Sequence, residues 1–430
     1  MIFFSTIIDY SVGIGISKQE SPTKRKILLW TSIAINLGFL AFFKYHNFFL
    51  DNFITAFSIF GTEIQANSLN IILPVGISFY TFQTLSYTID VYKRKLEPTK
   101  DFIVFSAFVS FFPQLVAGPI ERATHLLPQF YNKRSFDYSK AVDGMRQILW
   151  GLFKKIVIAD NCANYANLIF NNSTEYTGST LVLGALFFTF QIYGDFSGYS
   201  DIAIGTSRLF GFDLMRNFNF PYFSRDIAEF WRRWHISLST WFRDYLYIPL
   251  GGSRGGTWMK VRNTFIIFIV SGFWHGANWT FIIWGAINAI YYLPLLLTNR
   301  NRNNLEPVAL GQILPDFRDL ISILLTFSLT VFAWIFFRAE SLEHAFQYIF
   351  DIFQNPDSFF QLGSYWKYKS LIVLIFIFLL VEWYGRNGQF AISHLGINWW
   401  RPLRHAMYYA IIISIFWFGG KEQQFIYFQF

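Results

Sequence analysis

The 430-residue chain is 53% hydrophobic and 21% aromatic but only 14% charged, whereas an average soluble domain carries about a quarter charged residues. This composition excludes an ordinary soluble core and predicts a multi-pass membrane protein. The net charge of +8 does not indicate nucleic-acid binding, because the basic residues gather in loops between apolar runs. The single cysteine, Cys162, excludes an internal disulfide framework and a cysteine-rich metal site.

Several apolar windows have about the length that a helix needs to cross a bilayer. They lie near residues 27–50, 70–92, 102–118, 141–159, 180–212, 263–298, 319–337, 370–385 and 405–420. The windows 180–212 and 263–298 are too long for one simple crossing, so we expect each to hold a hairpin or a broken helix. The sequence shows neither a long linker nor an internal repeat, and we therefore expect residues 1–430 to form one membrane domain.

Loop charges predict the orientation of the chain in the membrane. The loops 17–26 and 93–100 are basic, and the segment 214–262 holds eight Lys and Arg residues, so we expect all three in the cytoplasm. The segment 171–180 has no basic residue and is expected on the outer side. The segment 119–140 is basic but does not fit a scheme of simple crossings.

The region QIYGDFSGYSDIAIG, residues 191–205, places two aspartates and three glycines in an otherwise apolar run. The glycines are explained by close contact between helices. That explanation does not extend to Asp195 and Asp201, because lipid cannot solvate a carboxylate. We therefore expect Asp195 to line a polar cavity or tunnel.

The motif PYFSRDIAEFWRRWHISLSTWFRDYLYIPLGGSRGG, residues 221–256, predicts one amphipathic helix with Ser224 as its N-cap and an end near Pro249. Aromatic side chains recur along it at three- and four-residue steps and form one face. The simplest interpretation is a helix at the membrane interface with snorkelling arginines. That interpretation leaves His235, at the edge of the aromatic face, unexplained.

The stretch SGFWHGANWT, residues 271–280, places His275 between two runs that contain no charged residue. An ionisable side chain at membrane depth usually has a partner or a function. His275 is either a core residue hydrogen-bonded between helices or a general base, which must be unprotonated to act. The motif alone does not decide between these two interpretations.

Taken together, FWRRWHISLSTWFRDYLYIPLGGSR and SGFWHGANWTFIIWG resemble the membrane-bound O-acyltransferase superfamily and, within it, the bacterial alginate O-acetyltransferase branch. The blocks YGDFSGYSDIAIG, LVAGPIER, LPVGISFYTFQ and FGGKEQQFIYFQF are similar to the same branch, so the resemblance covers essentially the whole chain. The resemblance implies an all-α integral membrane fold, a multi-helix bundle with re-entrant or broken helices around a central funnel or tunnel. It also implies two polar residues at the heart of the bundle, which correspond to His235 and His275.

The resemblance further implies transfer of an acyl group, expected to be acetyl, from a cytosolic thioester such as acetyl-CoA to hydroxyls of an exported polysaccharide such as alginate. His275 is expected to act as the general base, and His235 to orient the donor or stabilise charge on the carbonyl oxygen. Residues expected to bind substrate or line the tunnel are Asp195, Arg232, Trp234, Trp274 and Asn278. We expect no tightly bound cofactor, no metal, an extracytoplasmic acetyltransferase or polysaccharide-modifying partner, and a place in the bacterial cytoplasmic membrane.

Other functions fit the same residues. The family resemblance is compatible with D-alanyl transfer to teichoic acid or with acetylation of peptidoglycan. Intramembrane aspartates and glycine-rich breaks also fit a proton-coupled or polysaccharide transporter without chemistry of its own. Members of the branch usually begin with further hydrophobic sequence, whereas Met1 opens directly on FFSTIIDYSVG, so we expect either a truncated chain or a missing peripheral helix.

Overall fold

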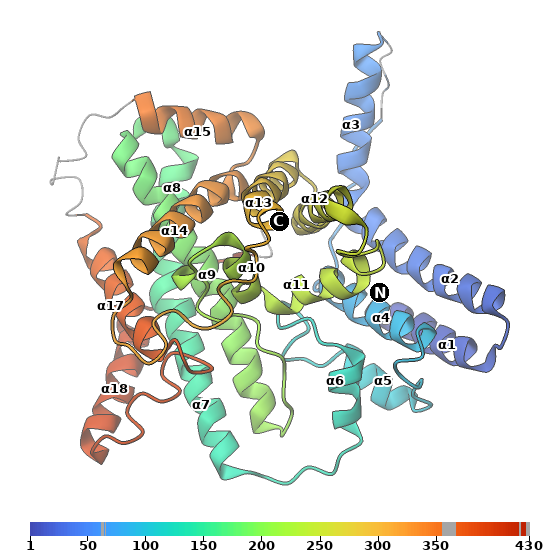
Figure 1. Cartoon of the computed structure of the whole chain (residues 1–430), viewed down its shortest axis with the longest axis horizontal. Coiled ribbons are helices and arrows are strands. Elements are labelled where there is room, and N and C mark those ends of the chain that lie inside the picture. The colour runs from blue at the N-terminus through green and yellow to red at the C-terminus, as the bar shows by residue number, and fades with distance from the viewer. Residues whose placement is uncertain (62–63, 65, 355–366, 421–422, 427–430) are drawn as a thin grey trace. The chain divides into compact units, whose positions relative to one another are not determined.

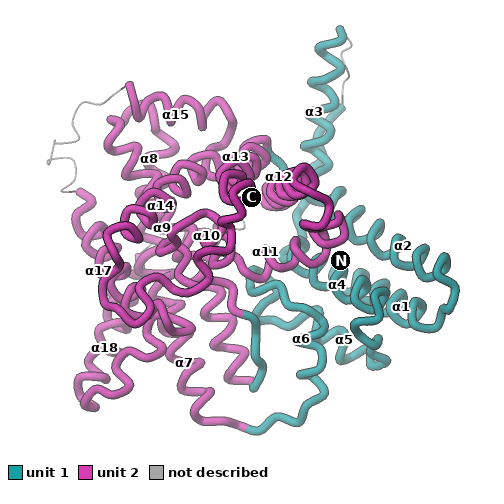
Figure 2. Tube along the Cα trace, in the orientation of Figure 1, with its two compact units in different colours: residues 1–135, 211–215, 276–278 teal, residues 136–210, 216–275, 279–430 magenta. Residues whose placement is uncertain are grey.

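The computed structural model describes residues 1–61, 64, 66–354, 367–420 and 423–426. Over these residues the secondary structure is helical, with no β-strand (Figure 1). The chain divides into two compact units (Figure 2). Unit 1 comprises residues 1–135, 211–215 and 276–278, and unit 2 comprises residues 136–210, 216–275 and 279–430. Whether the two units make up the one expected domain stays a prediction.

The helices of unit 1 are α1 (Ile2–Lys18), α2 (Pro22–Leu40), the π-helix η1 (Ala41–Tyr45), α3 (His46–Ile59), α4 (Ile77–Tyr92), α5 (Phe102–Val109), α6 (Ala123–Leu126) and the 3-10 helix η2 (Leu127–Phe130). Helices α1, α2 and α4 pack on one another. A buried carboxylate holds two of them together, because Asp9 accepts hydrogen bonds from Ser32 and from Asn36, the latter at 2.9 Å. A buried charge of this kind is tolerated only when it is hydrogen-bonded in this way.

The expected crossing at 102–118 is wrong. Helix α5 has only eight residues and ends at Val109, after which the chain turns through Gln114 and Gly118. At 1.5 Å per residue such a helix spans about 12 Å, well short of a hydrocarbon core of about 30 Å. The apolar composition that suggested a crossing instead buries Phe105 and Phe108 inside unit 1.

Unit 2 is built around the long helix α9 (Gly178–Leu209). The other helices of unit 2 are α7 (Tyr138–Leu152), η3 (Phe153–Ala159), α8 (Asp160–Asn171), η4 (Ser173–Glu175), η5 (Pro221–Phe223), α10 (Ile227–Arg233), α11 (Ile236–Phe242), η6 (Arg243–Tyr247), α12 (Gly256–His275), α13 (Trp279–Leu297), α14 (Phe317–Arg338), α15 (Leu342–Gln354), α17 (Lys369–Gly385) and α18 (Arg401–Phe418). Helix α9 packs against α7, α8, α14 and α15, and most of its side chains are buried.

Of the two windows expected to hold a hairpin or a break, one is confirmed and one is wrong. Window 263–298 does break, because α12 ends at His275 and α13 begins at Trp279. Window 180–212 forms one unbroken helix of 32 residues, α9. The polar residues of α9 therefore find partners on neighbouring helices, and the helix has no need to open around them.

Glycines bring α7 and α9 into close contact, as expected. A Cβ added to Gly151 would lie 2.7 Å from the carbonyl oxygen of Gly198, and one added to Gly144 would lie 2.7 Å from that of Gly205. Gly144 and Gly151 are seven residues apart on α7, and Gly198 and Gly205 are seven residues apart on α9. The glycine contact therefore repeats after about two helical turns. Larger side chains at these positions would push the two helices apart.

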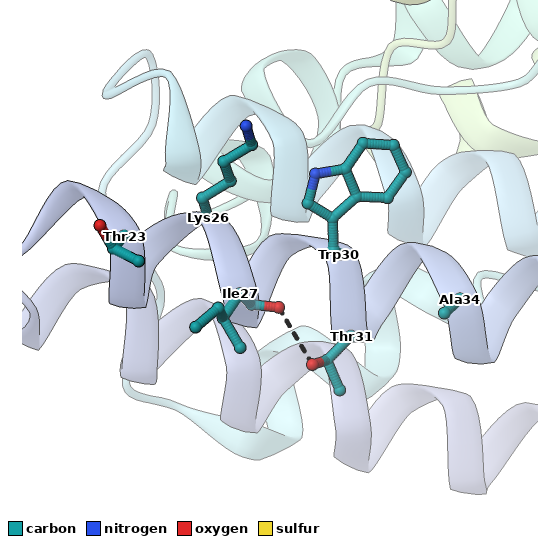
Figure 3. A pocket seen from close by; sticks show the side chains of 6 residues that line it. All are labelled: Thr23, Lys26, Ile27, Trp30, Thr31 and Ala34. Carbon is teal, nitrogen blue, oxygen red and sulfur yellow. Dashed lines mark hydrogen bonds between the residues drawn. The ribbon is translucent and has the colours of Figure 1, made fainter.

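Within the described residues, four helical stretches are long and apolar enough to cross a membrane: Pro22–Ile59, Gly178–Leu209, Trp279–Leu297 and Phe317–Arg338. The all-α architecture expected of an integral membrane bundle is therefore confirmed. A shallow groove on the first stretch is lined only by α2, from Thr23 to Ala34 (Figure 3). It holds Lys26 and Trp30, residue types that are common where helices meet lipid headgroups.

Candidate active site

His235 lies at a break between two short helices. Helix α10 ends at Arg233, α11 begins at Ile236, and His235 between them adopts a left-handed backbone conformation with φ 44° and ψ 53°. The single amphipathic helix expected over this motif is therefore wrong. Its expected N-cap is also wrong, because the cap of α10 is Asp226, which accepts a hydrogen bond from the Glu229 amide at 2.7 Å.

His275 is the last residue of α12, and the turn 276–278 follows it. The two histidines therefore both stand at helix ends, where the backbone changes direction. Both are buried, with 1% of His235 and 6% of His275 exposed. For His275, which ends an apolar run expected to cross the membrane, such non-helical backbone is tolerated where protein or a polar cavity surrounds it.

The fold of unit 2 brings the two histidines together. Their ring centres are 6.5 Å apart, and the indole of Trp274 lies beside both, 5.0 Å from His275 and 6.0 Å from His235. This separation is too large for a direct hydrogen bond between the rings. A ligand group such as a carbonyl oxygen is of a size to bridge two rings at this separation.

Aromatic rings from three helices surround the pair. Phe196 of α9 and His235 form a T-shaped pair with ring centres 4.6 Å apart, and the rings of Trp284 of α13 and Phe337 of α14 lie 5.3 Å and 5.2 Å from that of His275. All three side chains are buried. Such walls exclude water, so that any charge developing between the histidines would interact strongly with them.

His235 is the more unusual of the two histidines. Neither of its ring nitrogens has a hydrogen-bond partner among the residues that the structure describes. Burial lowers the pKa of His235 well below its usual range, and the neighbouring His275 adds to this effect. A neutral imidazole has one N–H donor and one acceptor, and leaving both unused in a buried place is costly. The arrangement suits a site whose partner is a substrate.

Of the other predicted site residues, Trp274 belongs to this cluster and Trp234 lies next to it. Trp234 directly precedes His235 and packs against Trp334 at 5.1 Å and Phe218 at 5.0 Å. It is therefore part of the packing that supports the break between α10 and α11. Asn278 lies in the turn 276–278, which groups with unit 1, and its substrate-binding role stays a prediction.

Arg232 holds a loop. Its guanidinium donates to the carbonyl oxygens of Asn301 and Asn304, each at 2.7 Å, and the adjacent Arg233 donates to that of Glu306. Together these bonds fix the connection between α13 and α14 against α10. Hydrogen bonds of this kind occupy both terminal nitrogens of Arg232, and its expected tunnel-lining role stays a prediction.

Asp195 lies in a second polar region, against the π-helix η3. Lys155 contacts it at 2.8 Å, and the amide of Ile426 donates to its other oxygen at 2.7 Å. Lys155 also contacts Asp160 at 2.8 Å. The carboxylate is thus paired within the protein, and its expected role in lining a cavity stays a prediction.

Sequence reasoning missed the aromatic walls. Phe196, Trp284 and Phe337 come from three helices that are far apart in the chain, and 54 Phe and 15 Trp residues give no means of choosing among them. It also missed Asn217, which is fully buried and whose main-chain oxygen accepts a hydrogen bond from the amide of Ile236, the residue after His235. A polar residue next to the motif was the only local signal.

Comparison with known proteins shows which family the chain belongs to. The model of the membrane-bound O-acyltransferase family matches residues 93–313. A probable alginate O-acetylase of Pseudomonas putida is 37% identical, with 99% of this chain and 89% of that protein aligned. The chain belongs to the membrane-bound O-acyltransferase family. The resemblance seen in its sequence motifs is thereby confirmed.

Two further relatives show how the similarity is distributed. A probable alginate O-acetylase of Pseudomonas aeruginosa is 42% identical over 80% of this chain, and the chain spans 63% of that relative's length. The peptidoglycan O-acetyltransferase of Helicobacter pylori is 37% identical over 79% of this chain and 67% of its own length. As a membrane-bound O-acyltransferase, the protein is a multi-pass membrane enzyme that uses an acyl donor, and the transporter alternative is not supported.

Proposed function

We propose that this acyltransferase moves an acetyl group from a cytosolic thioester, such as acetyl-CoA, to hydroxyl groups of an exported polysaccharide such as alginate. The observation that carries the proposal is the buried pair of His235 and His275, held 6.5 Å apart by aromatic walls. The relatives named for alginate and for peptidoglycan are both acetyl-transferring enzymes by name, which favours acetyl over D-alanyl as the cargo.

The two histidines divide the chemistry. His275 accepts the proton of the acceptor hydroxyl while the hydroxyl oxygen attacks the thioester carbonyl carbon. A C–O bond forms, the C–S bond breaks, and the proton passes from His275 to the departing thiolate. His235, which is neutral, donates its one N–H to the carbonyl oxygen as negative charge develops there. Because water is excluded, this hydrogen bond is stronger than it would be in solution.

The acceptor side requires a partner in this proposal. An exported glycan lies outside the membrane, whereas an acyl thioester is supplied from the cytosol. We infer that the enzyme sits in the bacterial cytoplasmic membrane and hands the acetyl group to an extracytoplasmic acetyltransferase or polysaccharide-modifying protein, or to the glycan itself. The basic segment 214–262, with its eight Lys and Arg residues, then faces the donor.

The reaction is tested with purified protein in lipid nanodiscs and acetyl-CoA labelled in the acetyl group. We expect release of free CoA that increases when an alginate oligosaccharide is added, together with label in the oligosaccharide. Labelled D-alanyl thioester serves as the competing donor, and peptidoglycan fragments serve as the competing acceptor. Absence of thioester cleavage with every donor and acceptor would contradict the proposal.

Orientation in the membrane is tested separately by cysteine labelling in a Cys162→Ala background. Cys162 is buried, so its replacement removes the only native thiol without changing the surface. Thr257 and Thr174 are both exposed and lie in segments expected on opposite sides of the membrane. We expect an impermeant thiol reagent to label Thr174→Cys in intact cells and Thr257→Cys only after lysis. Labelling of Thr257→Cys in intact cells would overturn the orientation.

A further inference from the structure

The backbone of His235 requires an explanation of its own. With φ at 44° and ψ at 53°, it occupies the left-handed region, which residues with a Cβ rarely adopt. His235 is also buried and makes no hydrogen bond through its ring to any residue in the described part of the chain. Its conformation is therefore imposed by neighbouring residues, as is common at functional sites.

Asn217 forms hydrogen bonds with the two residues directly after His235. The main-chain oxygen of Asn217 accepts a hydrogen bond from the Ile236 amide at 2.9 Å. Its side-chain oxygen accepts from the Ser237 hydroxyl at 2.9 Å and from the Ser237 amide at 3.3 Å. These three bonds fix the first turn of α11, and with it the direction in which the chain leaves His235.

The same segment grips the chain before His235. The amide of Asn219 donates to the carbonyl oxygen of Arg233 at 2.9 Å, and the guanidinium of Arg233 donates back to the carbonyl oxygen of Asn219 at 3.2 Å. Residues 217–219 therefore clamp the backbone on both sides of the strained position. A relaxed conformation at His235 would break bonds on one side or the other.

Helix α9 anchors this clamp. The side-chain amide of Asn217 donates to the hydroxyl of Ser200 at 3.1 Å. Phe196, one turn earlier on the same face of α9, contacts the ring of His235 at 4.6 Å. One face of α9 thus contacts both the imidazole of His235 and Asn217, which bonds the backbone next to His235. The position of the ring is thereby fixed relative to that of its backbone.

We propose that Asn217 is a positioning residue for the acyl-transfer reaction: it holds His235 in its left-handed conformation so that the imidazole points at the carbonyl oxygen of the donor. The inference rests on the proposed function, because it assigns His235 a place at that oxygen. Without the side chain of Asn217, residue 235 relaxes toward an ordinary helical or extended conformation. The imidazole then leaves the position opposite His275.

Kinetics test the proposal through a double-mutant cycle. We expect Asn217→Ala to lower kcat roughly tenfold to a hundredfold, less than the hundredfold to ten-thousandfold that a positioned catalytic group itself contributes, with little change in KM for acetyl-CoA. In a His235→Ala background the same substitution should cause little further loss, because the residue through which it acts is gone. Equal losses in both backgrounds would show that Asn217 acts independently of His235 and would overturn the proposal.

A milder variant covers the case in which Asn217→Ala does not fold. Ser237→Ala removes one donor to the Asn217 side chain and leaves the main-chain bond at Ile236 in place. We expect a smaller loss of kcat that also disappears in the His235→Ala background. Ser207→Ala is the matched control, because Ser207 is equally buried and, within the described residues, its hydroxyl bonds only to the carbonyl oxygen of Ala203 in its own helix. It should leave kcat unchanged.

A second measurement does not depend on activity. Diethyl pyrocarbonate modifies accessible neutral imidazoles, and mass spectrometry reads the modification at each histidine. We expect His235 to react slowly in the wild type and several-fold faster in Asn217→Ala, while the exposed His394 reacts equally in both. Unchanged reactivity of His235 would contradict the positioning role. If the wild type transfers no acetyl group, the proposed function fails, and this measurement still decides whether Asn217 holds His235.

Discussion

The aspartates of α9 and His235, which packs against the same helix, are all buried, yet they differ in their hydrogen-bond partners. Asp201 contacts Lys154 and accepts a hydrogen bond from Gln147 at 2.8 Å, and Asp195 is paired with Lys155. His235, which touches α9 through Phe196, has no hydrogen-bond partner for either ring nitrogen within the described residues.

This difference separates structural from functional polarity. A buried ion pair with several hydrogen-bond partners adds little net stability to the folded protein. Removing one partner is nevertheless strongly destabilising, because the remaining charge is left uncompensated in a low-dielectric interior. A buried imidazole without partners is costly to the folded protein, and its cost is offset when a substrate supplies the missing hydrogen bonds. Variants of the aspartate–lysine regions should therefore lose folded protein, whereas variants of the histidines should lose chemistry.

The largest effect is expected from His275→Ala. A positioned general base contributes about a hundredfold to ten-thousandfold in rate, so acetyl transfer per folded molecule should fall by at least a hundredfold. The fraction of protein that elutes as a single species from a detergent column, and its Tm, should change little. His405→Ala, on the exposed surface of α18, is the matched control and should behave as the wild type.

Two outcomes would contradict this assignment. One is near-normal turnover in His275→Ala. The other is a loss of activity that is fully accounted for by a loss of folded protein. That result would mean that His275 serves the packing of the core and has no part in the reaction. His235→Ala should also impair turnover, through loss of the hydrogen bond to the carbonyl oxygen.

The two histidines were predictable, and their surroundings were not. An imidazole within an apolar run is a local signal, which singled out His275 and the break after it. His235 lies in an Arg-rich motif and was singled out by its place at the edge of the aromatic face and by the family resemblance. The break at His235 depends on hydrogen bonds that Asn217 accepts from Ile236 and Ser237, and Asn217 lies outside the helical pattern. Periodicity describes what a helix would bury, and it contains no information about a segment that interrupts that helix from another part of the chain.

Lys154→Met should produce the opposite result to His275→Ala. Lys154 is buried in contact with Asp201, and it also interacts electrostatically with the nearby Glu382. Removing the lysine takes away the cation that contacts Asp201 and leaves Arg216 as a remaining positive charge near the two buried carboxylates. Loss of one partner of a buried ion pair typically costs about 3–5 kcal/mol. We expect a much lower yield and Tm, with normal activity per folded molecule. Asp201→Asn, which keeps an acceptor for Gln147, should be milder.

Inactivity of a well-folded Lys154→Met variant would show that this region contacts substrate after all. The comparison between Lys154→Met and His275→Ala therefore requires both quantities, folded fraction and turnover, on the same preparations. The same pair of measurements distinguishes a uniform loss of stability from a defect confined to the reaction.

A smaller effect is expected at Asp195, where the sequence predicted a cavity and the structure places an ion pair. Asp195→Asn keeps an oxygen for the Ile426 amide, and Lys155 keeps Asp160, so the loss should be about 1 kcal/mol. Asp195→Leu leaves the amide without an acceptor and should cost more, about 1–3 kcal/mol. Thermal unfolding in detergent measures both. A folded but inactive Asp195→Asn variant would instead support the tunnel-lining role.

The sequence could not have distinguished these roles for Asp195. An isolated carboxylate in an apolar run predicts that a partner or a cavity exists, but not which of the two. The partner, Lys155, is brought to Asp195 by the π-helix η3 and by glycines that let α9 approach it: a Cβ on Gly194 would lie 2.9 Å from the carbonyl oxygen of Lys154. Such close packing is a property of two segments together.

The smallest expected effect concerns a histidine that does have a partner, in unit 1. The ring of His125 lies 2.7 Å from Glu121, which is fully buried and also accepts a hydrogen bond from the Met215 amide. The hydrogen bond to Glu121 raises the pKa of His125, and burial raises the pKa of Glu121. His125 is thus stabilised in its charged form, the reverse of His235.

Both groups have a higher pKa in the folded than in the unfolded protein, so both contribute stability at low pH that is lost as the pH rises. For His125 the loss begins above its unfolded value of 6.5. Because the ring is partly exposed, solvent screens the pair, and we expect the Tm to fall by only roughly 1–3 °C between pH 6 and pH 8. His125→Gln keeps a donor for Glu121 but does not titrate, so it should flatten this slope and leave the pH dependence of kcat unchanged. An equal slope in His125→Gln would show that other groups set it, and a changed kcat profile would place His125 in the reaction together with His235 and His275.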